Sequence, residues 1–484
     1  MKIISLAATM LLMTCACAAE IAAEPESPEV SFTFKSGSGE ETEAFRGEFT
    51  VPENRANPDG RQLTINYVRF ASTAANPGAP IVYLAGGPGG SGIETAKGRR
   101  FSLFMAMREF GDVIALDQRG TGASDQTPRC RSSVFLPPDQ ALSDAQYVQL
   151  HLDSIAECEA FWKSEGIDLN GYTTLENAAD LDDLRAHLGA EKITLWGISY
   201  GSHLALTALK TMGERIDRVI IASAEGLDQT VKLPARTDAY FDRLQAAINT
   251  DPTAAAMMPD IKALIARVHA RVENAPLTIS LPQKDGTAID LVVDRITLQT
   301  ISSAMIADPQ NAVRLIWIYL AMDAGDTAPL AQLLGYFYEP GEPISWSAMS
   351  LAMDVASGIS NERLALVNEQ AKTALLRDYL NFPMPQARGT IGGLDLGEEF
   401  RNGPVSDVPT LLFSGTLDGR TYPESQIEAT AGLTNLTKVT VINAGHNLFM
   451  TSPEVTKTIQ AFMRGEAVKD GEIEIALPSL VPGE

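Results

Sequence analysis

The segment ITLWGISYG, residues 193–201, joins a run of apolar residues to a sharp turn built around Ser199. Residues 202–212 follow with apolar side chains at three- and four-residue spacing, which predicts a helix. A glycine two residues before the serine and another two residues after it leave room for so tight a turn. The five-residue pattern alone occurs by chance, but its strand and helix context predicts a serine hydroxyl exposed at a sheet edge.

Further apolar runs resemble residues 193–196, and each is followed by a glycine or polar turn. These runs are Ile81–Ala85, Val113–Leu116, Val219–Ala222, Leu411–Phe413 and Val439–Ile442. Near-continuous apolar strands that alternate with helices are typical of a parallel sheet buried on both faces. Earlier runs of alternating polarity, at residues 31–35, 45–51 and 62–70, predict antiparallel strands. The expected fold class is therefore α/β, with a mostly parallel central sheet.

A base and an acid for Ser199 are expected at the ends of two later strands. A serine hydroxyl needs a neighbouring base to accept its proton, and His446 directly follows the run 439–442. Asp418 follows the run 411–413 and gives the order serine, aspartate, histidine, in which the carboxylate orients the imidazole. Asp407 precedes that run and would lie at the opposite edge of the sheet. The remaining histidines, His151, His187, His203 and His269, fall within apparent helices and are expected to be surface or packing residues.

Backbone amides are expected to bind the oxyanion of a tetrahedral intermediate. One is the N–H of Tyr200, directly after the serine, and the other is the N–H of Gly87 in the glycine loop 86–90. Gly86 and Gly89 remain alternatives to Gly87. The loop lacks the lysine and hydroxyl of a phosphate-binding loop and the spacing of a dinucleotide fingerprint.

Residues 117–124, DQRGTGAS, follow another strand and invite catalytic roles. We expect instead that Asp117 and Arg119 hold turns beneath the site through hydrogen bonds and charge pairing. No cysteine or histidine cluster has the spacing of metal ligands, so neither a metal nor another cofactor is inferred.

The sequence between residues 226 and 401 loses the strand and helix alternation and becomes mainly helical. We therefore expect a helical cap at 226–401 inserted into a catalytic domain of residues 30–225 and 402–484. The aromatic segment 336–346 within the cap either lines a pocket or belongs to the core of the cap.

The first residues have the layout of an export signal. A lysine, an apolar run and a stretch of small residues predict a signal peptide at 1–19, followed by a flexible leader at 20–29. Ordinary cleavage is expected, with lipid attachment at Cys15 or Cys17 as the alternative. Export makes a disulfide between Cys130 and Cys158 plausible, the alternative being two buried thiols.

The composition is that of a globular protein, with 45% hydrophobic and 20% charged residues in 484. The formal net charge of −23 repels nucleic-acid phosphates and anionic lipid surfaces, so neither is an expected partner. No run after the signal is long and apolar enough to predict a membrane span.

With these motifs in place, the chain resembles the proline iminopeptidase and tripeptidyl aminopeptidase family of α/β-hydrolases. The resemblance rests on residues 86–91, 117–122 and 197–201, on Gly415 with Asp418, and on Gly445 with His446, all in family order. It is weak across the cap. In that family acidic side chains of the cap bind the free amino terminus of a peptide, a role that the resemblance offers to Glu225 first and to Asp354 or Glu339 as alternatives.

The resemblance implies an exported peptidase that releases residues from peptide N-termini through an acyl-enzyme. An esterase or amidase with the same three residues is the main alternative, because the cap alone would choose between peptide and small acyl substrates. A non-catalytic binding module on the same scaffold is the hypothesis of a different class. The preferred residue, the length released and the oligomeric state are left open.

Overall fold

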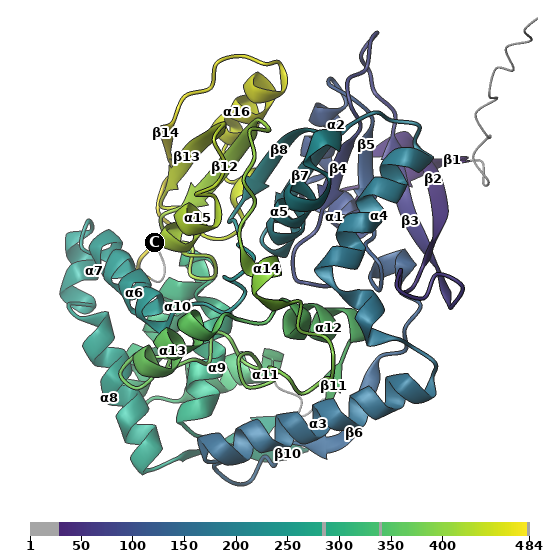
Figure 1. The fold of residues 1–484 in the computed structure, drawn as a ribbon. Helices are drawn as coiled ribbons and strands as arrows, with labels where there is room; N and C mark the ends of the chain where they lie inside the picture. Colours follow the sequence, from purple (N-terminus) through teal and green to yellow (C-terminus); the bar gives the residue numbers. More distant parts are fainter. Residues whose placement is uncertain (1–28, 283–286, 338–340, 482–484) are drawn as a thin grey trace, which may run out of the picture.

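A twisted ten-stranded sheet forms the centre of the molecule in the computed structural model, which describes residues 29–282, 287–337 and 341–481 (Figure 1). The strand order is β1-β2-β3-β5-β4-β7-β8-β12-β13-β14. The strands are β1 (Val30–Lys35), β2 (Glu41–Pro52), β3 (Gln62–Phe70), β4 (Ile81–Leu84), β5 (Val113–Leu116), β7 (Ile193–Ile198), β8 (Ile216–Ala222), β12 (Thr410–Gly415), β13 (Leu436–Ile442) and β14 (Gly471–Glu474). The first three strands are antiparallel, as is the β3–β5 pair, and all pairs from β5 to β14 are parallel. The mostly parallel α/β sheet expected from the apolar runs is confirmed.

Helices cover both faces of this sheet, which is why every residue of β4, β5 and β7 is buried. One face carries α1 (Gly92–Lys97), α2 (Phe101–Met107) and α16 (Pro453–Met463), and the other carries α4 (Thr174–His187), α5 (Tyr200–Met212) and α15 (Pro423–Ala429). Successive side chains of β7 alternate between the two cores: Leu195 packs on one face and Trp196 on the other. Both layers fix the position of the turn that follows β7.

The inserted region has its own hydrophobic core and lies below the sheet in Figure 1. Its helices are α6 (Pro234–Ile248), α7 (Pro252–Met257), α8 (Ile261–Asn274), α9 (Arg295–Met305), α10 (Pro309–Asp323), α11 (Ala328–Phe337), α12 (Ala348–Ser357), α13 (Asn361–Gln370) and α14 (Gly397–Arg401). A hairpin of β9 (Leu277–Pro282) and β10 (Ala288–Val293) interrupts them. The region is thus mainly helical with one small sheet of its own.

A second excursion from the sheet domain joins the cap. Strand β6 (Cys130–Phe135) pairs antiparallel with β11 (Pro343–Trp346), and the long helix α3 (Asp144–Ser164) packs beside them. A disulfide between Cys130 and Cys158 ties β6 to α3. Part of the segment assigned from sequence to the sheet domain therefore contributes to the cap, because a short amphipathic strand carries no local signal of its distant partner.

The last strand of the sheet corresponds to none of the apolar runs in the sequence. After α16 the chain adds β14, which pairs in parallel with β13 at the edge of the sheet. Its Gly-Glu-Ile-Glu sequence suits an exposed edge strand, since charged residues there discourage further pairing.

The predicted signal peptide, most of the leader, Cys15 and Cys17 lie outside the described residues. Within the described ranges no helix has the length and apolar character that a bilayer crossing requires.

Candidate active site

Ser199 stands in the turn between β7 and α5, as the sequence predicted. Its backbone has φ 55° and ψ −128°, a conformation that a residue with a side chain rarely adopts. A Cβ atom on Gly201 would overlap the carbonyl oxygen of Leu84, so this position has room only for glycine. The Ser199 N–H donates to the carbonyl oxygen of Ala222 in β8 at 3.1 Å, which anchors the turn to the neighbouring strand.

His446 and Asp418 meet beyond the ends of β13 and β12. The Nδ1 atom of His446 lies 3.1 Å from each carboxylate oxygen of Asp418, whose side chain is fully buried. The carboxylate also accepts from the N–H groups of Arg420 and Thr421 at 2.8 and 2.9 Å, and from the Thr421 hydroxyl at 2.7 Å. Burial alone would raise the pKa of Asp418, but His446 and these donors lower it below its ordinary value. An ionised carboxylate in this position holds one imidazole tautomer.

The backbone of His446 is held from two directions. Its N–H donates to the carbonyl oxygen of Ala307, between α9 and α10 of the cap, at 2.9 Å. Its carbonyl oxygen accepts from the Ser223 hydroxyl at 2.8 Å, and Ser223, which follows β8, has a left-handed φ of 51°. Sequence reasoning missed both contacts, because neither residue belongs to a motif.

The glycine loop 86–90 follows β4 and packs against the nucleophile. A Cβ on Gly86 would lie 3.0 Å from the Cβ of Ser199, so the backbone approaches the serine closely. Gly87 has φ 127°, and the N–H of Gly90 closes the loop on the Gly86 carbonyl oxygen at 3.0 Å. Tyr200 is the first residue of α5, so its N–H has no acceptor inside the helix. The glycine loop thus lies against Ser199, and Tyr200 directly follows that serine at the start of α5.

Residues 117–124 support this loop. The carboxylate of Asp117 accepts from the Ser91 hydroxyl at 2.6 Å, from the N–H of Ile93 at 3.1 Å and from the N–H of Ala123 at 2.8 Å. Arg119 is fully buried and makes two hydrogen bonds of 2.6 Å to Asp180. The prediction that these residues hold turns is confirmed.

Helix α12 of the cap lies directly on the glycine loop and the nucleophile turn. The Ser350 hydroxyl donates to the carbonyl oxygen of Pro88 at 3.0 Å, and the Tyr200 hydroxyl contacts the sulfur of Met353 at 2.8 Å. A cavity of about 270 Å³ opens beside this helix. Its lining consists of Arg129, Ser345, Trp346, Ser347, Ser350, Leu351, Asp354 and Pro383.

Asp354 is the acidic residue of this cavity. Within the described residues its carboxylate has no ion pair, and burial together with the charge of Glu225 raises its pKa to about 7, against the opposing effects of Lys232 and Arg420. Glu225 is also buried, but its carboxylate lies 2.8 Å from the ammonium of Lys232 and is already neutralised. Glu339 lies outside the described residues.

His203 and His269 are hydrogen-bonded to neighbouring groups in the interior of the protein. The Nδ1 atom of His203 lies 3.0 Å from the carbonyl oxygen of Gly226, and its Nε2 atom lies 3.2 Å from the Ser357 hydroxyl. The ring is fully buried, which lowers its pKa. His269 is bonded to the Tyr319 hydroxyl at 2.6 Å within the cap. Their expected packing role is confirmed.

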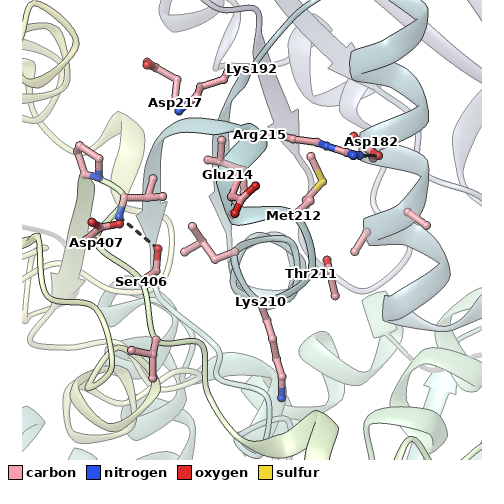
Figure 2. A pocket seen from close by; sticks show the side chains of 18 of the residues that line it. Asp182, Lys192, Lys210, Thr211, Met212, Glu214, Arg215, Asp217, Ser406 and Asp407 are labelled. Atoms are coloured by element: carbon pink, nitrogen blue, oxygen red, sulfur yellow. Dashed lines mark hydrogen bonds and ion pairs between the residues drawn. The ribbon is translucent and has the colours of Figure 1, made fainter.

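A larger cavity of about 870 Å³ lies at the opposite edge of the sheet (Figure 2). It is lined by residues at the start of β8 and just before β12, whereas Ser199 and Asp418 follow the ends of strands. Figure 2 shows Arg215 reaching Asp182, and Lys210 donates to the carbonyl oxygen of Asn402 at 3.0 Å. Asp407 lines this cavity, as its position before the strand predicted.

Part of this chain is similar in sequence to known peptidases. The serine protease Hip1 of Mycobacterium tuberculosis (strain ATCC 25618 / H37Rv) is 30% identical over 187 residues, which are 37% of this chain and 36% of that protein. A tripeptidyl aminopeptidase of Streptomyces lividans is 27% identical over 186 residues, 37% of this chain and 34% of its own. A probable proline iminopeptidase of Streptomyces coelicolor is 32% identical over 169 residues, 34% of this chain and 40% of its own. The chain thus spans well under half the length of these relatives.

Solved structures and a family comparison extend over more of the chain. A proline iminopeptidase-related protein of Thermus thermophilus covers 87% of this chain and 96% of its own, at 15% identity and a TM-score of 0.35. The family described as alpha/beta hydrolase fold matches residues 79–453, a span that begins just before β4 and ends at the start of α16. Together with the strand order and the turn at Ser199, this match means that the chain belongs to the α/β-hydrolase fold family.

Proposed function

We propose that this protein is an exported serine peptidase that removes residues from the amino termini of peptides. The observation that carries the hydrolase part is the pair of hydrogen bonds between His446 and buried Asp418, in a chain whose nucleophile turn holds Ser199. The peptidase part is supported by the names of the relatives and by the carboxylate of Asp354 in the cavity beside α12, which has no ion pair within the described residues.

The proposed reaction passes through an acyl-enzyme. The Ser199 hydroxyl attacks the scissile carbonyl carbon while the Nε2 atom of His446 takes its proton, and Asp418 stabilises the resulting imidazolium. The oxyanion is met by the N–H groups of Tyr200 and Gly87, with the Gly86 amide as the alternative donor. The carbon–nitrogen bond then breaks and the imidazolium protonates the leaving amine. Water activated by His446 hydrolyses the ester and restores the serine.

The free amino group of the substrate is proposed to bind in the cavity beside α12. Asp354 lies four residues beyond Ser350, which touches the glycine loop, so the two Cα atoms are about 6 Å apart along the helix axis. A bound ammonium would favour the charged form of this carboxylate. Glu225 would attract the substrate ammonium less strongly than Asp354, because Lys232 already pairs with its carboxylate.

The first test uses arylamides of proline and alanine with free or blocked amino termini, beside short acyl esters. Wild type and Ser199→Ala are compared. The proposal expects cleavage of free-amine arylamides that the variant loses. Ester cleavage that is indifferent to an amino group would move the protein to the esterase class, and activity that survives in Ser199→Ala would remove this serine from the mechanism.

Export is part of the same proposal, and it rests on the signal-like residues 1–19. The mass of the protein recovered from the cell envelope or medium distinguishes ordinary cleavage from lipid attachment at Cys15 or Cys17. Recovery of an uncleaved chain in the cytoplasm would contradict export.

A further inference from the structure

A second polar cavity, of about 770 Å³, adjoins the loop that carries His446. It lies between the end of α1, the start of α10, the His446 loop and the tail after β14. Gly445 and Asn447, on either side of His446, both belong to its wall. The cavity therefore borders the backbone of the loop that carries the proposed general acid, while the cavity of Asp354 lies beside α12.

Protonation of the leaving group determines which part of a peptide substrate would lie near the His446 loop. The imidazolium of His446 must reach the leaving nitrogen to protonate it, so the departing part of a peptide has to pass along the His446 loop. The opposite part of the peptide, with the free amine, is directed to α12 in the proposed function. The cavity beside the His446 loop is thus placed for the residues that follow the scissile bond.

The charges in this cavity suit a carboxylate. Arg99 is exposed, and its guanidinium makes no ion pair or hydrogen bond with the described part of the chain. Arg100 is tethered by hydrogen bonds to the Tyr83 hydroxyl and, at 3.3 Å, to the side-chain oxygen of Asn447. Asp308 is the one acidic residue of the described lining, and its carboxylate accepts from the Asn447 amide at 3.3 Å. Two cations against one carboxylate leave a positive site on a chain of net charge −23.

We propose that this cavity binds a carboxylate of the leaving peptide, with Arg99 as its free cation and Arg100 as a fixed one. The inference rests on the proposed peptidase function and adds to it a preference for short peptide substrates with a negative charge after the scissile bond. That charge comes either from the carboxyl terminus or from an acidic side chain. Arg99 is a specificity-determining residue in this account and takes no part in bond breaking.

The test compares three peptides with the same cleavable first residue, chosen as the best arylamide substrate. One is a tetrapeptide with three following alanines and a free carboxylate, the second is its carboxamide, and the third is a carboxamide with aspartate at the second position. Wild type is expected to prefer the first over the second by about fivefold in kcat/KM at low salt, with the preference falling as salt rises. A high rate with the third peptide would identify the acidic side chain as the source of the charge.

Variants separate the site from its surroundings. Arg99→Ala is expected to bring the acid-to-amide ratio close to one, and Arg99→Glu to invert it. The ratio is internal to each variant, so the amount of folded enzyme cancels. Arg314→Ala is the matched control, since Arg314 is an exposed arginine of α10 outside the cavity and its loss should keep the wild-type ratio.

A binding measurement makes the inference independent of turnover. Calorimetry on Ser199→Ala compares trialanine with its carboxamide, and the free acid is expected to bind more tightly by a similar factor, which Arg99→Ala removes. Equal binding of acid and amide, or an acid preference unchanged by Arg99→Ala, overturns the inference while free-amine arylamide cleavage still upholds the proposed function. Failure to cleave any arylamide or peptide, with esters cleaved, overturns the proposed function itself.

Discussion

The carboxylate of Asp418 accepts more hydrogen bonds than the one from the imidazole that orienting His446 requires. Its two oxygens accept from the imidazole, from two backbone N–H groups and from one hydroxyl. An asparagine side chain would turn an NH₂ group toward donors, or toward the imidazole, in place of one oxygen. The charge and the tautomer of His446 both depend on this residue.

Asp418→Asn is therefore expected to lower kcat by about 10³-fold to 10⁴-fold with little change in KM, as loss of an orienting carboxylate does in serine hydrolases. Steady-state kinetics on the best arylamide measures this. Asp407→Asn is the control, because Asp407 lies at the opposite sheet edge and should leave kcat unchanged. A fall of less than tenfold in Asp418→Asn would contradict the assignment.

The raised pKa of Asp354 gives substrate binding a pH dependence. The carboxylate is protonated below about pH 7, so KM for a free-amine arylamide should fall as pH rises from about 6 to 7.5. The substrate's own amine has a pKa of about 7.7–8.0, so its loss of a proton opposes this change only near the upper limit. A short acyl ester, which requires the same base but has no ammonium, should not show this change in KM. Asp354→Asn should remove it, and an unchanged KM profile in that variant would exclude Asp354 from amine binding.

The same group affects stability with a definite sign. Because its pKa is raised in the folded chain, the folded state binds more protons than the unfolded state between about pH 4 and pH 7. The contribution of Asp354 to the free energy of unfolding therefore falls as pH rises through this window. At pH 8, Asp354→Asn should raise the free energy of unfolding by roughly 1–3 kcal/mol and therefore raise Tm. At pH 4 the substitution should have no stabilising effect. Thermal unfolding at the two pH values measures the difference.

Sequence reasoning located those residues whose place in the strand and helix pattern is fixed. Ser199, Asp418 and His446 each follow an apolar run, and parallel strands bring such positions to one edge. The partners of His446 could not be found in this way. Ala307 contributes only a carbonyl oxygen and Ser223 a single hydroxyl, and both reach the histidine because the tertiary fold places them there.

At the scale of elements, helix α12 connects the cap to the glycine loop and to the turn that carries Ser199. Its Ser350 hydroxyl donates to the Pro88 carbonyl oxygen, and Pro88 directly follows Gly87, whose amide is a proposed oxyanion donor. Ser350 is a positioning residue in this arrangement, since it would act through the loop.

Ser350→Ala should lower kcat by about fivefold, the effect of one lost hydrogen bond of about 1 kcal/mol, with a smaller change in KM. Ser350→Thr retains the hydroxyl and should recover most of the rate. The affinity of a boronic acid inhibitor, which imitates the tetrahedral intermediate, should weaken in parallel with kcat in the alanine variant. A change in KM alone would show that the residue only lines the cavity.

The helices of the cap could be predicted from the sequence, but the pairing of its strands could not. Helices such as α6 and α8 were visible from their apolar spacing. The β6–β11 pair was not, because its strands lie more than two hundred residues apart and each is too short to specify a partner. The cavity of Asp354 depends on this pair, since Ser345 and Trp346 belong to β11.

At the scale of the whole molecule, the disulfide ties this wall together. Cys130 pairs in register with Trp346, and Cys158 lies on α3, whose Ser154 accepts a hydrogen bond from the Trp346 indole at 2.9 Å. The double variant Cys130→Ser/Cys158→Ser should lose about 3.5 kcal/mol of stability, the chain-entropy value for closing a loop of 28 residues.

The same variant should raise KM for free-amine arylamides more than KM for short esters, because the wall of the Asp354 cavity loosens while the nucleophile turn is anchored elsewhere. Thermal unfolding and the two KM values measure these effects. Treating wild type with a thiol reductant provides an independent comparison. An equal rise in both KM values would mean that the disulfide supports the entire site.

The contact between the Ala307 carbonyl oxygen and the His446 N–H gives the molecule a safeguard during its own synthesis. The chain supplies its nucleophile first, then the inserted region, and the acid and base last. Even a full-length chain has its histidine correctly seated only after α9 and α10 have packed, because their connecting segment holds that residue. The base proposed for Ser199 is thus fully anchored only in a chain whose inserted region has folded, which ties any activity of this site to completion of the fold.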